Sequence, residues 1–132
     1  MPIVERKPKR FPSSLPMIPN SNALPMGATI GILGGGQLGR MLALAAARLG
    51  FRTHIYCPDP QSPAFDVTPR STVAAYDDET ALAAFASAVD VITYEFENVP
   101  AETAAFLSRL KPLRPDSHAL GIAQDRLAEK AF

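Results

Sequence analysis

The sequence predicts an α/β domain in which a mostly parallel, open sheet carries helices on both faces. Two observations predict this class. Short β-rich segments alternate with segments whose apolar residues follow helical spacing, and a glycine-rich loop at 34–36 joins the first strand to the first helix. Strands that alternate with helices form parallel sheets, because each helix carries the chain back over one face. A chain of 132 residues is long enough for one such domain.

The first half of the domain is predicted as strand, helix and strand. Residues 28–33, "ATIGIL", are a short apolar run that predicts a buried strand. A helix is predicted over 37–49, where apolar side chains recur at helical spacing, and Gly50 is a natural stop. The alternating, β-rich segment 51–56 predicts the second strand. The apolar positions of the helix are Leu38, Met41, Leu42, Ala45 and Leu49.

The middle of the chain predicts a loop and a second strand–helix–strand unit. Residues 57–70 are punctuated by proline and predict a loop. A short third strand is expected at 71–75, followed by an alanine-rich helix at 77–89 that begins with acidic capping residues. Residues 89–96, "VDVITYEF", are the strongest strand candidate in the chain.

The last part of the chain predicts two further helices. Pro100 lies near the start of the first, expected over 97–110, and residues 111–115 form a short strand or a connector. The second begins at Asp116 or Ser117 and continues to the last residue.

The bulk composition excludes some function classes. Lys+Arg and Asp+Glu both number 13, so the zero net charge argues against binding nucleic acid through a basic surface. No apolar run approaches the roughly 18 residues of a membrane helix. The single cysteine, Cys57, fits a reducing, cytoplasmic setting. Residues 1–27 are proline-rich and without a period, which predicts a flexible leader, dispensable for folding, ahead of a domain at 28–132.

The glycine loop is the first candidate site. Gly34, Gly36 and Gly39 satisfy G-x-G-x-x-G between a strand and a helix, where unpaired helix N–H groups meet a ligand. A dinucleotide site also needs an acidic residue at the end of the second strand. Cys57 stands there, and Asp59 follows behind a proline, which disfavours a nicotinamide dinucleotide. A purely structural role, packing the strand against the helix, is the other alternative.

Polar side chains supply the second candidate site. Gln37 puts an amide at the mouth of the glycine loop, where it suits a polar ligand. Glu95 and Glu97 follow the strongest strand, at the sheet edge where open α/β folds bind ligands. They are two residues apart and share one face of an extended chain, so one of them is suited to accept hydrogen bonds from a ligand amine or hydroxyl. The alternative is an exposed pair in which Glu97 or Asn98 caps the next helix.

Three stretches of the chain together carry a family likeness. "GATIGILGGGQLGRMLALAAARLGF", "VDVITYEFENVP" and "AQDRLAEKAF" resemble the N5-carboxyaminoimidazole ribonucleotide synthetases, the ATPase subunits of phosphoribosylaminoimidazole carboxylase, in the ATP-grasp superfamily. The resemblance implies a Rossmann-like N-terminal domain similar to that of biotin carboxylase. It also implies a purine-pathway ligase that uses ATP, Mg²⁺ and bicarbonate to carboxylate 5-aminoimidazole ribonucleotide, working as a homodimer.

The resemblance also implies roles for particular residues. In such proteins the first glycine loop binds the ribonucleotide substrate and not a dinucleotide, so the residues at the mouth of the loop are implied to bind substrate. Arg126 matches a family position that touches ATP. Glu95 or Glu97 is expected to face the same ribonucleotide. The implied substrate-binding set is Gly35, Gly36, Gln37, Leu38, Glu95 and Glu97.

One departure from the family pattern bears on activity. The acidic Mg²⁺ ligands, the ATP-binding lysines and the lid of an ATP-grasp domain are absent from the 132 residues, so the sequence predicts an N-terminal domain that does not turn over ATP alone. The apolar residues of its last helix, up to Phe132, are then expected to be exposed to solvent, and the chain is expected to self-associate through them. The competing predictions are a nicotinamide-dependent oxidoreductase fragment and a non-catalytic interaction module.

Overall fold

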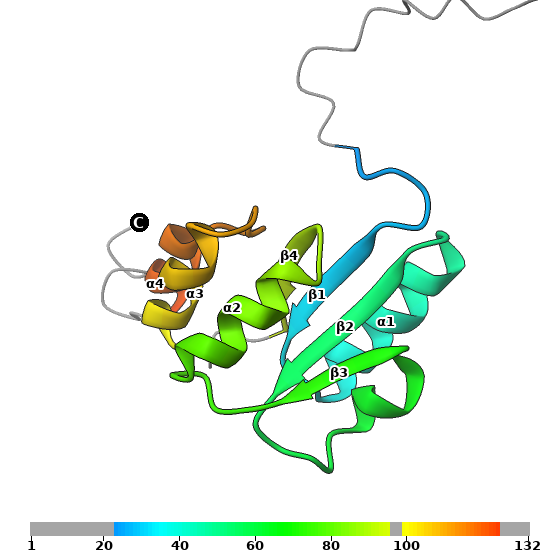
Figure 1. Cartoon of the computed structure of the whole chain (residues 1–132), viewed down its shortest axis with the longest axis horizontal. Helices are drawn as coiled ribbons and strands as arrows, with labels where there is room; N and C mark the ends of the chain where they lie inside the picture. The colour runs from blue at the N-terminus through cyan, green and yellow to red at the C-terminus, as the bar shows by residue number, and fades with distance from the viewer. Residues whose placement is uncertain (1–22, 96–98, 125–132) are drawn as a thin grey trace, which may run out of the picture.

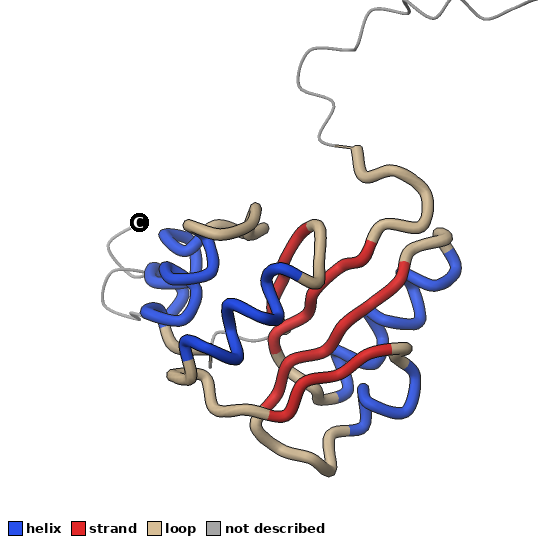
Figure 2. Tube along the Cα trace, in the orientation of Figure 1, coloured by secondary structure: helices blue, strands red, loops and turns tan. Residues whose placement is uncertain are grey.

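A parallel four-stranded sheet forms the centre of the computed structural model, which describes residues 23–95 and 99–124 (Figures 1 and 2). Strands and helices alternate along most of the chain, as predicted. The elements are β1 (Thr29–Leu33), α1 (Gln37–Arg48), β2 (Arg52–Cys57), the 3₁₀-helix η1 (Pro63–Val67), β3 (Arg70–Val73), α2 (Glu79–Ser87), β4 (Val91–Tyr94), α3 (Ala101–Ser108) and α4 (Ser117–Gln124).

The strand order is β3-β2-β1-β4, and every pair is parallel. Ile32 of β1 stands opposite Ile55 of β2 and Thr93 of β4. The predicted strand or connector at 111–115 is a connector with one parallel bridge, between Leu113 and Ile92. Since β1 lies between β2 and β4, the loops that follow these three strands meet at one edge of the sheet.

Helices cover both faces of the sheet, which confirms the predicted class. Ile32 and Ile55 point to the face covered by α1 and η1, while Leu33 and Tyr56, one residue further along each strand, point to the face covered by α2, α3 and α4. Figure 1 shows α2 in front of the sheet and α1 behind it. This alternation is the period of two that a buried strand imposes on its side chains.

A glycine in β1 lets α2 approach the sheet closely. A Cβ at Gly31 would lie 2.6 Å from Cζ of Phe85 and 3.1 Å from the methyl groups of Val89. Phe85 is buried and also makes an edge-to-face contact with His54, at 5.1 Å between ring centroids. The packing of α2 therefore depends on the missing side chain at Gly31.

Helix α1 packs on the sheet through its small residues. Its buried positions are Gly39, Ala43 and Ala46. The larger apolar side chains that revealed the helix in the sequence lie on the other side, and Met41 is 62% exposed. The exposed apolar residues on or just after α1 are Leu38, Met41, Leu42, Leu44 and Leu49.

The predicted helix boundaries agree with the structure to within a few residues. Asp78 caps α2, where its carboxylate accepts a hydrogen bond from Ala81 N at 3.0 Å. Asp116 caps α4 in the same way, through Ala119 N at 2.8 Å. Gly50 ends the first helical segment with φ +85°. The predictions for the leader before residue 23 and for the helix beyond Gln124 lie outside the described residues.

Candidate functional site

The glycine loop turns sharply between β1 and α1. Gly34 has φ +107°, a conformation that side chains disfavour, and its N–H donates to the carbonyl of Tyr56 at 2.9 Å. The carbonyl of Gly35 accepts from Ala64 N at 2.9 Å, which ties the loop to η1. Gly36 is the N-cap of α1 and has no side chain to offer that helix.

A carboxylate from the end of β4 takes the place of that missing cap. Glu95 follows the last residue of β4, and its N–H continues the strand ladder by donating to Leu33 O at 2.9 Å. Its side chain then turns toward α1, where Oε2 accepts a hydrogen bond from Gly36 N at 2.8 Å. A negative charge at a helix N-terminus is stabilised by about 0.3–1 kcal/mol, and more when the pair is partly buried.

Three glycines make room for this carboxylate. A Cβ at Gly34 would lie 2.7 Å from Glu95 Oε2, and one at Gly39 would lie 2.9 Å from the same atom. A Cβ at Gly36 would collide with Oε1. The G-x-G-x-x-G spacing is therefore explained by a protein carboxylate that fills the loop.

The position of Glu95 argues against a dinucleotide in this loop. A pyrophosphate would need the N–H groups at the start of α1, but Gly36 N is engaged by a negatively charged side chain. At the end of β2, Asp59 is engaged in its own turn, where it accepts from Gln61 N at 2.9 Å. Glu95 Oε1 is buried and accepts no hydrogen bond from the residues that the structure describes. A ligand with an amine or a hydroxyl group suits that atom better than a phosphate does.

A pocket of about 220 Å³ opens beside the loop. Cys57 lies in its wall at the end of β2, and the Ser62 hydroxyl donates to Cys57 Sγ at 3.2 Å. Ser62 also packs on Gly35, where a Cβ would lie 2.5 Å from the serine Cβ. The lining residues are Leu33, Gly34, Gly35, Gly36, Cys57, Tyr76, Glu95 and Val99.

The structure brings together only part of the predicted substrate-binding set. Gly35, Gly36 and Glu95 line the pocket, whereas Gln37 and Leu38 are exposed on the first turn of α1 and do not line it. Glu97 and Arg126 lie outside the described residues.

Two polar residues near the site, Arg40 and His54, have structural partners. Arg40 faces Asp66 of η1 at 3.8 Å, an exposed pair of little energetic weight. His54 is buried, and its Nε2 lies 2.7 Å from Thr72 Oγ1. Burial, and then the charge of Arg70, lower the pKa of His54 from its ordinary value, so a role in the core fits it better than a role in catalysis.

Sequence reasoning missed Tyr76 as a site residue. It follows β3 in the loop to α2 and lines the same pocket as Glu95. Burial raises the pKa of Tyr76, and its hydrogen-bonded neighbour Cys57 and the charge of Glu95 raise it further. Its place after a predicted strand was the available signal, because ligands collect at the carboxyl ends of parallel strands.

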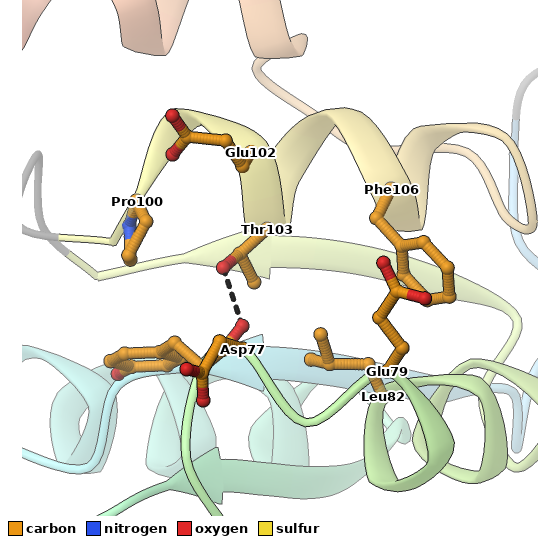
Figure 3. A pocket seen from close by; sticks show the side chains of 8 residues that line it. Asp77, Glu79, Leu82, Pro100, Glu102, Thr103 and Phe106 are labelled. Carbon is orange, nitrogen blue, oxygen red and sulfur yellow. Dashed lines mark hydrogen bonds between the residues drawn. The ribbon is translucent and has the colours of Figure 1, made fainter.

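A second pocket of about 280 Å³ lies between α2 and α3. Figure 3 shows Asp77, Glu79 and Glu102 around it, with Thr103 reaching across from α3. Leu82 and Phe106 contribute apolar side chains to its lining. Tyr76 lines both pockets and so forms a wall between them.

The described part of the chain contains neither a cluster of metal-ligating side chains nor a helix that could span a membrane. Within residues 23–95 and 99–124, no three His, Cys, Asp or Glu side chains gather as a metal site requires. No helix in the same ranges is long and apolar enough to cross a membrane.

The fold and the site together define an open, parallel α/β domain whose glycine loop is closed by a carboxylate from the neighbouring strand. The family model described as "Ribonucleotide synthetase preATP-grasp domain" matches residues 26–124. The chain belongs to this family.

Individual proteins that the chain resembles support this family assignment. The chain is similar to the N5-carboxyaminoimidazole ribonucleotide synthase of Brucella melitensis, at 55% identity over 113 residues, covering 86% of this chain and 31% of the relative. Among solved structures, the N5-carboxyaminoimidazole ribonucleotide synthetase of Thermus thermophilus has a TM-score of 0.75 at 51% identity, covering 78% of this chain and 28% of that one.

A ligand-bound structure is also similar. The N5-carboxyaminoimidazole synthase of Aspergillus clavatus, in complex with ADP and 5-aminoimidazole ribonucleotide, has a TM-score of 0.71 at 28% identity, covering 80% of this chain and 28% of that one. The chain thus spans about a third or less of the length of the relatives that it matches.

Proposed function

We propose that this chain forms the ribonucleotide-binding N-terminal part of an ATP-dependent carbon–nitrogen ligase of purine biosynthesis. The proposed reaction is the carboxylation of 5-aminoimidazole ribonucleotide by ATP and bicarbonate, and its proposed location is the cytoplasm. The observation that carries the proposal is the Glu95 carboxylate in the glycine loop, with one oxygen on Gly36 N and the other buried without a hydrogen-bond donor among the described residues.

Glu95 and the loop have complementary tasks in this proposal. The free oxygen of Glu95 accepts a hydrogen bond from an amine or a ribose hydroxyl of the ribonucleotide, while Gly35 and Gly36 let the ligand approach the backbone. Gln37 and Leu38 lie outside the pocket on the first turn of α1, and are proposed to contact the part of the ribonucleotide that extends beyond it. Glu97 is proposed to add a second carboxylate. Since a carboxylate repels phosphate, the ribonucleotide phosphate is expected to point away from this loop.

ATP and Mg²⁺ enter the proposal only through the family. Arg126 is proposed to touch ATP from this domain. ATP supplies the phosphoryl group that activates bicarbonate, and the residues of this chain that the structure describes do not gather a metal site. What the described residues do is bind and orient the acceptor amine.

The test is isothermal titration of the 132-residue chain with 5-aminoimidazole ribonucleotide, NAD and ATP. We expect the ribonucleotide to bind and NAD not to bind. Glu95→Gln should weaken ribonucleotide binding by about tenfold, because a hydrogen bond to a charged group contributes about 1.5–3 kcal/mol. Binding of NAD in place of the ribonucleotide would favour the oxidoreductase alternative. Binding of neither small molecule would favour an interaction module.

We also propose that the chain pairs with a second copy through α1. Support comes from the row of exposed apolar side chains on that helix, since contiguous apolar surface marks interaction sites. Sedimentation of the wild-type chain and of Met41→Glu tests this: a dimer that Met41→Glu converts to a monomer is expected. A wild-type monomer at micromolar concentration would contradict it.

A further inference from the structure

Tyr76 stands at the meeting point of the two pockets, on the loop between β3 and α2. It lines the glycine-loop pocket together with Glu95 and Cys57. It is half-buried, so part of its surface is open to a bound molecule. Nothing in the glycine motif requires an aromatic side chain at this place.

Two core hydroxyl groups hold the backbone beneath Tyr76. The Tyr56 hydroxyl donates to the carbonyl of Ala75 at 2.5 Å, and the Thr103 hydroxyl donates to the carbonyl of Tyr76 itself at 2.6 Å. Figure 3 shows this second hydrogen bond as a dashed line from Thr103 on α3. The rings of Tyr56 and Tyr76 also stack, with centroids 6.0 Å apart and planes at 28°.

These contacts fix both the backbone and the ring. Thr103 is buried, with 4% of its surface exposed, and belongs to α3, whereas Tyr56 belongs to β2. Loops ordinarily lack such attachments and move more than the elements they connect. A loop held from two core elements keeps its aromatic wall in place, which is the arrangement expected of a preorganised binding site.

We propose that Tyr76 is a substrate-contacting residue of the glycine-loop pocket and that Thr103 is its positioning residue. This inference rests on the proposed function and names the part of the site that receives the heterocycle. The aminoimidazole ring packs against the phenol ring of Tyr76, while the polar groups of the ribonucleotide meet Glu95.

The experiment measures the dissociation constant of 5-aminoimidazole ribonucleotide for the full 132-residue chain. Tyr76→Leu should weaken binding about tenfold, within the range measured for base–aromatic stacking. Thr103→Val should weaken it several-fold, and Thr103→Ser, which keeps the hydroxyl, should bind with wild-type affinity. Tyr94→Phe is the matched control, because it removes a tyrosine hydroxyl that does not line this pocket.

Tyrosine fluorescence provides a readout that loss of stability alone would not move. The chain has no tryptophan and three tyrosines, so a ligand against Tyr76 should change tyrosine emission. We expect this change in wild type and in Tyr94→Phe, and its loss in Tyr76→Leu. Thermal melts identify any variant that is unfolded at the temperature of the titration, and Tyr76→Phe then replaces Tyr76→Leu with a smaller expected loss of affinity.

The outcomes separate the two proposals. A wild-type chain that does not bind the ribonucleotide overturns the proposed function and this inference with it. Wild-type binding that is unchanged in folded Tyr76→Leu overturns the inference alone. If Thr103→Ser weakens binding as much as Thr103→Val does, the hydroxyl does not position Tyr76 and that part of the inference is wrong.

Discussion

Replacing Gly39 by alanine tests the account of the glycine loop. Glycine in a helix interior is less favourable than alanine by about 1 kcal/mol, so propensity alone predicts that Gly39→Ala stabilises α1. The structure predicts the opposite sign. The new Cβ would lie 2.6 Å from the carbonyl oxygen of Gly34, well inside the 3.4 Å at which ordinary contact begins, and 2.9 Å from Glu95 Oε2.

The obstacle at Gly39 is backbone, which has little freedom to yield. Gly34 is held at φ +107° and its N–H donates to Tyr56 O, so the backbone that carries this carbonyl is anchored to the neighbouring strand. Overpacking of this kind costs about 1–3 kcal/mol, and a rigid obstacle places Gly39→Ala in the upper half of that range. After the gain in helix propensity is subtracted, the net loss is about 1–2 kcal/mol, which lowers the melting temperature by roughly 5–15 °C in a domain of this size.

Gly121 provides the matched control, since it is also a helical glycine. A Cβ there meets nothing within 4 Å, so Gly121→Ala should raise the melting temperature by a few degrees. Thermal unfolding followed by circular dichroism measures both variants. If Gly39→Ala is as stable as Gly121→Ala, the carboxylate and the Gly34 carbonyl do not crowd α1, and the reasoning is refuted.

Three further predictions concern stability. Gly34→Ala should destabilise the chain more than Gly27→Ala in urea titrations, because both have positive φ but only Gly34 also meets Glu95, and equal losses would contradict this. The lowered pKa of His54 means that the unfolded chain binds its proton more readily. The contribution of His54 to the free energy of unfolding is therefore present above pH 6.5 and lost as pH falls below that value. His54→Gln should lack this loss, and a free energy of unfolding that depends on pH in the same way as in wild type would refute the assignment. Burial, and then the charges of Asp78 and Asp77, raise the pKa of Tyr56 to about 12, so the free energy of unfolding should fall as pH rises above 10. Spectrophotometric titration of folded Tyr56 near pH 10 would contradict this assignment.

The sequence was sufficient to predict the class of fold. Period-two and helical spacings are local properties of the chain, and they located the strands and helices with errors of a few residues at their ends. The capping role of Asp116 was likewise readable, because an N-cap bonds to an N–H only three residues away. The short 3₁₀-helix η1 lay within a segment predicted as loop, since its prolines obscured any period.

The site was predictable only in part. Glu95 could be chosen because it ends a strong strand, but its bond to Gly36 joins residues 59 apart in sequence, and no local pattern encodes that contact. Which side of α1 is exposed could not be predicted from the sequence either, because Ala43 and Ala46 pack on the sheet while the larger apolar residues of the helix are exposed to solvent. Tyr76 follows a predicted strand, which was a usable signal, but its contact with Thr103 of a distant helix is not encoded in any local pattern.

The central claim is that the carboxylate-closed glycine loop receives the ribonucleotide, and amide NMR tests it most directly. Titration of ¹⁵N-labelled chain with 5-aminoimidazole ribonucleotide should shift the amide signals of Gly35, Gly36 and Glu95 by far more than those of Arg52 and Thr53 at the amino end of β2, away from the pocket. NAD should leave all of them unchanged. Saturable ribonucleotide binding that shifts signals elsewhere and spares Gly35, Gly36 and Glu95 would contradict the account.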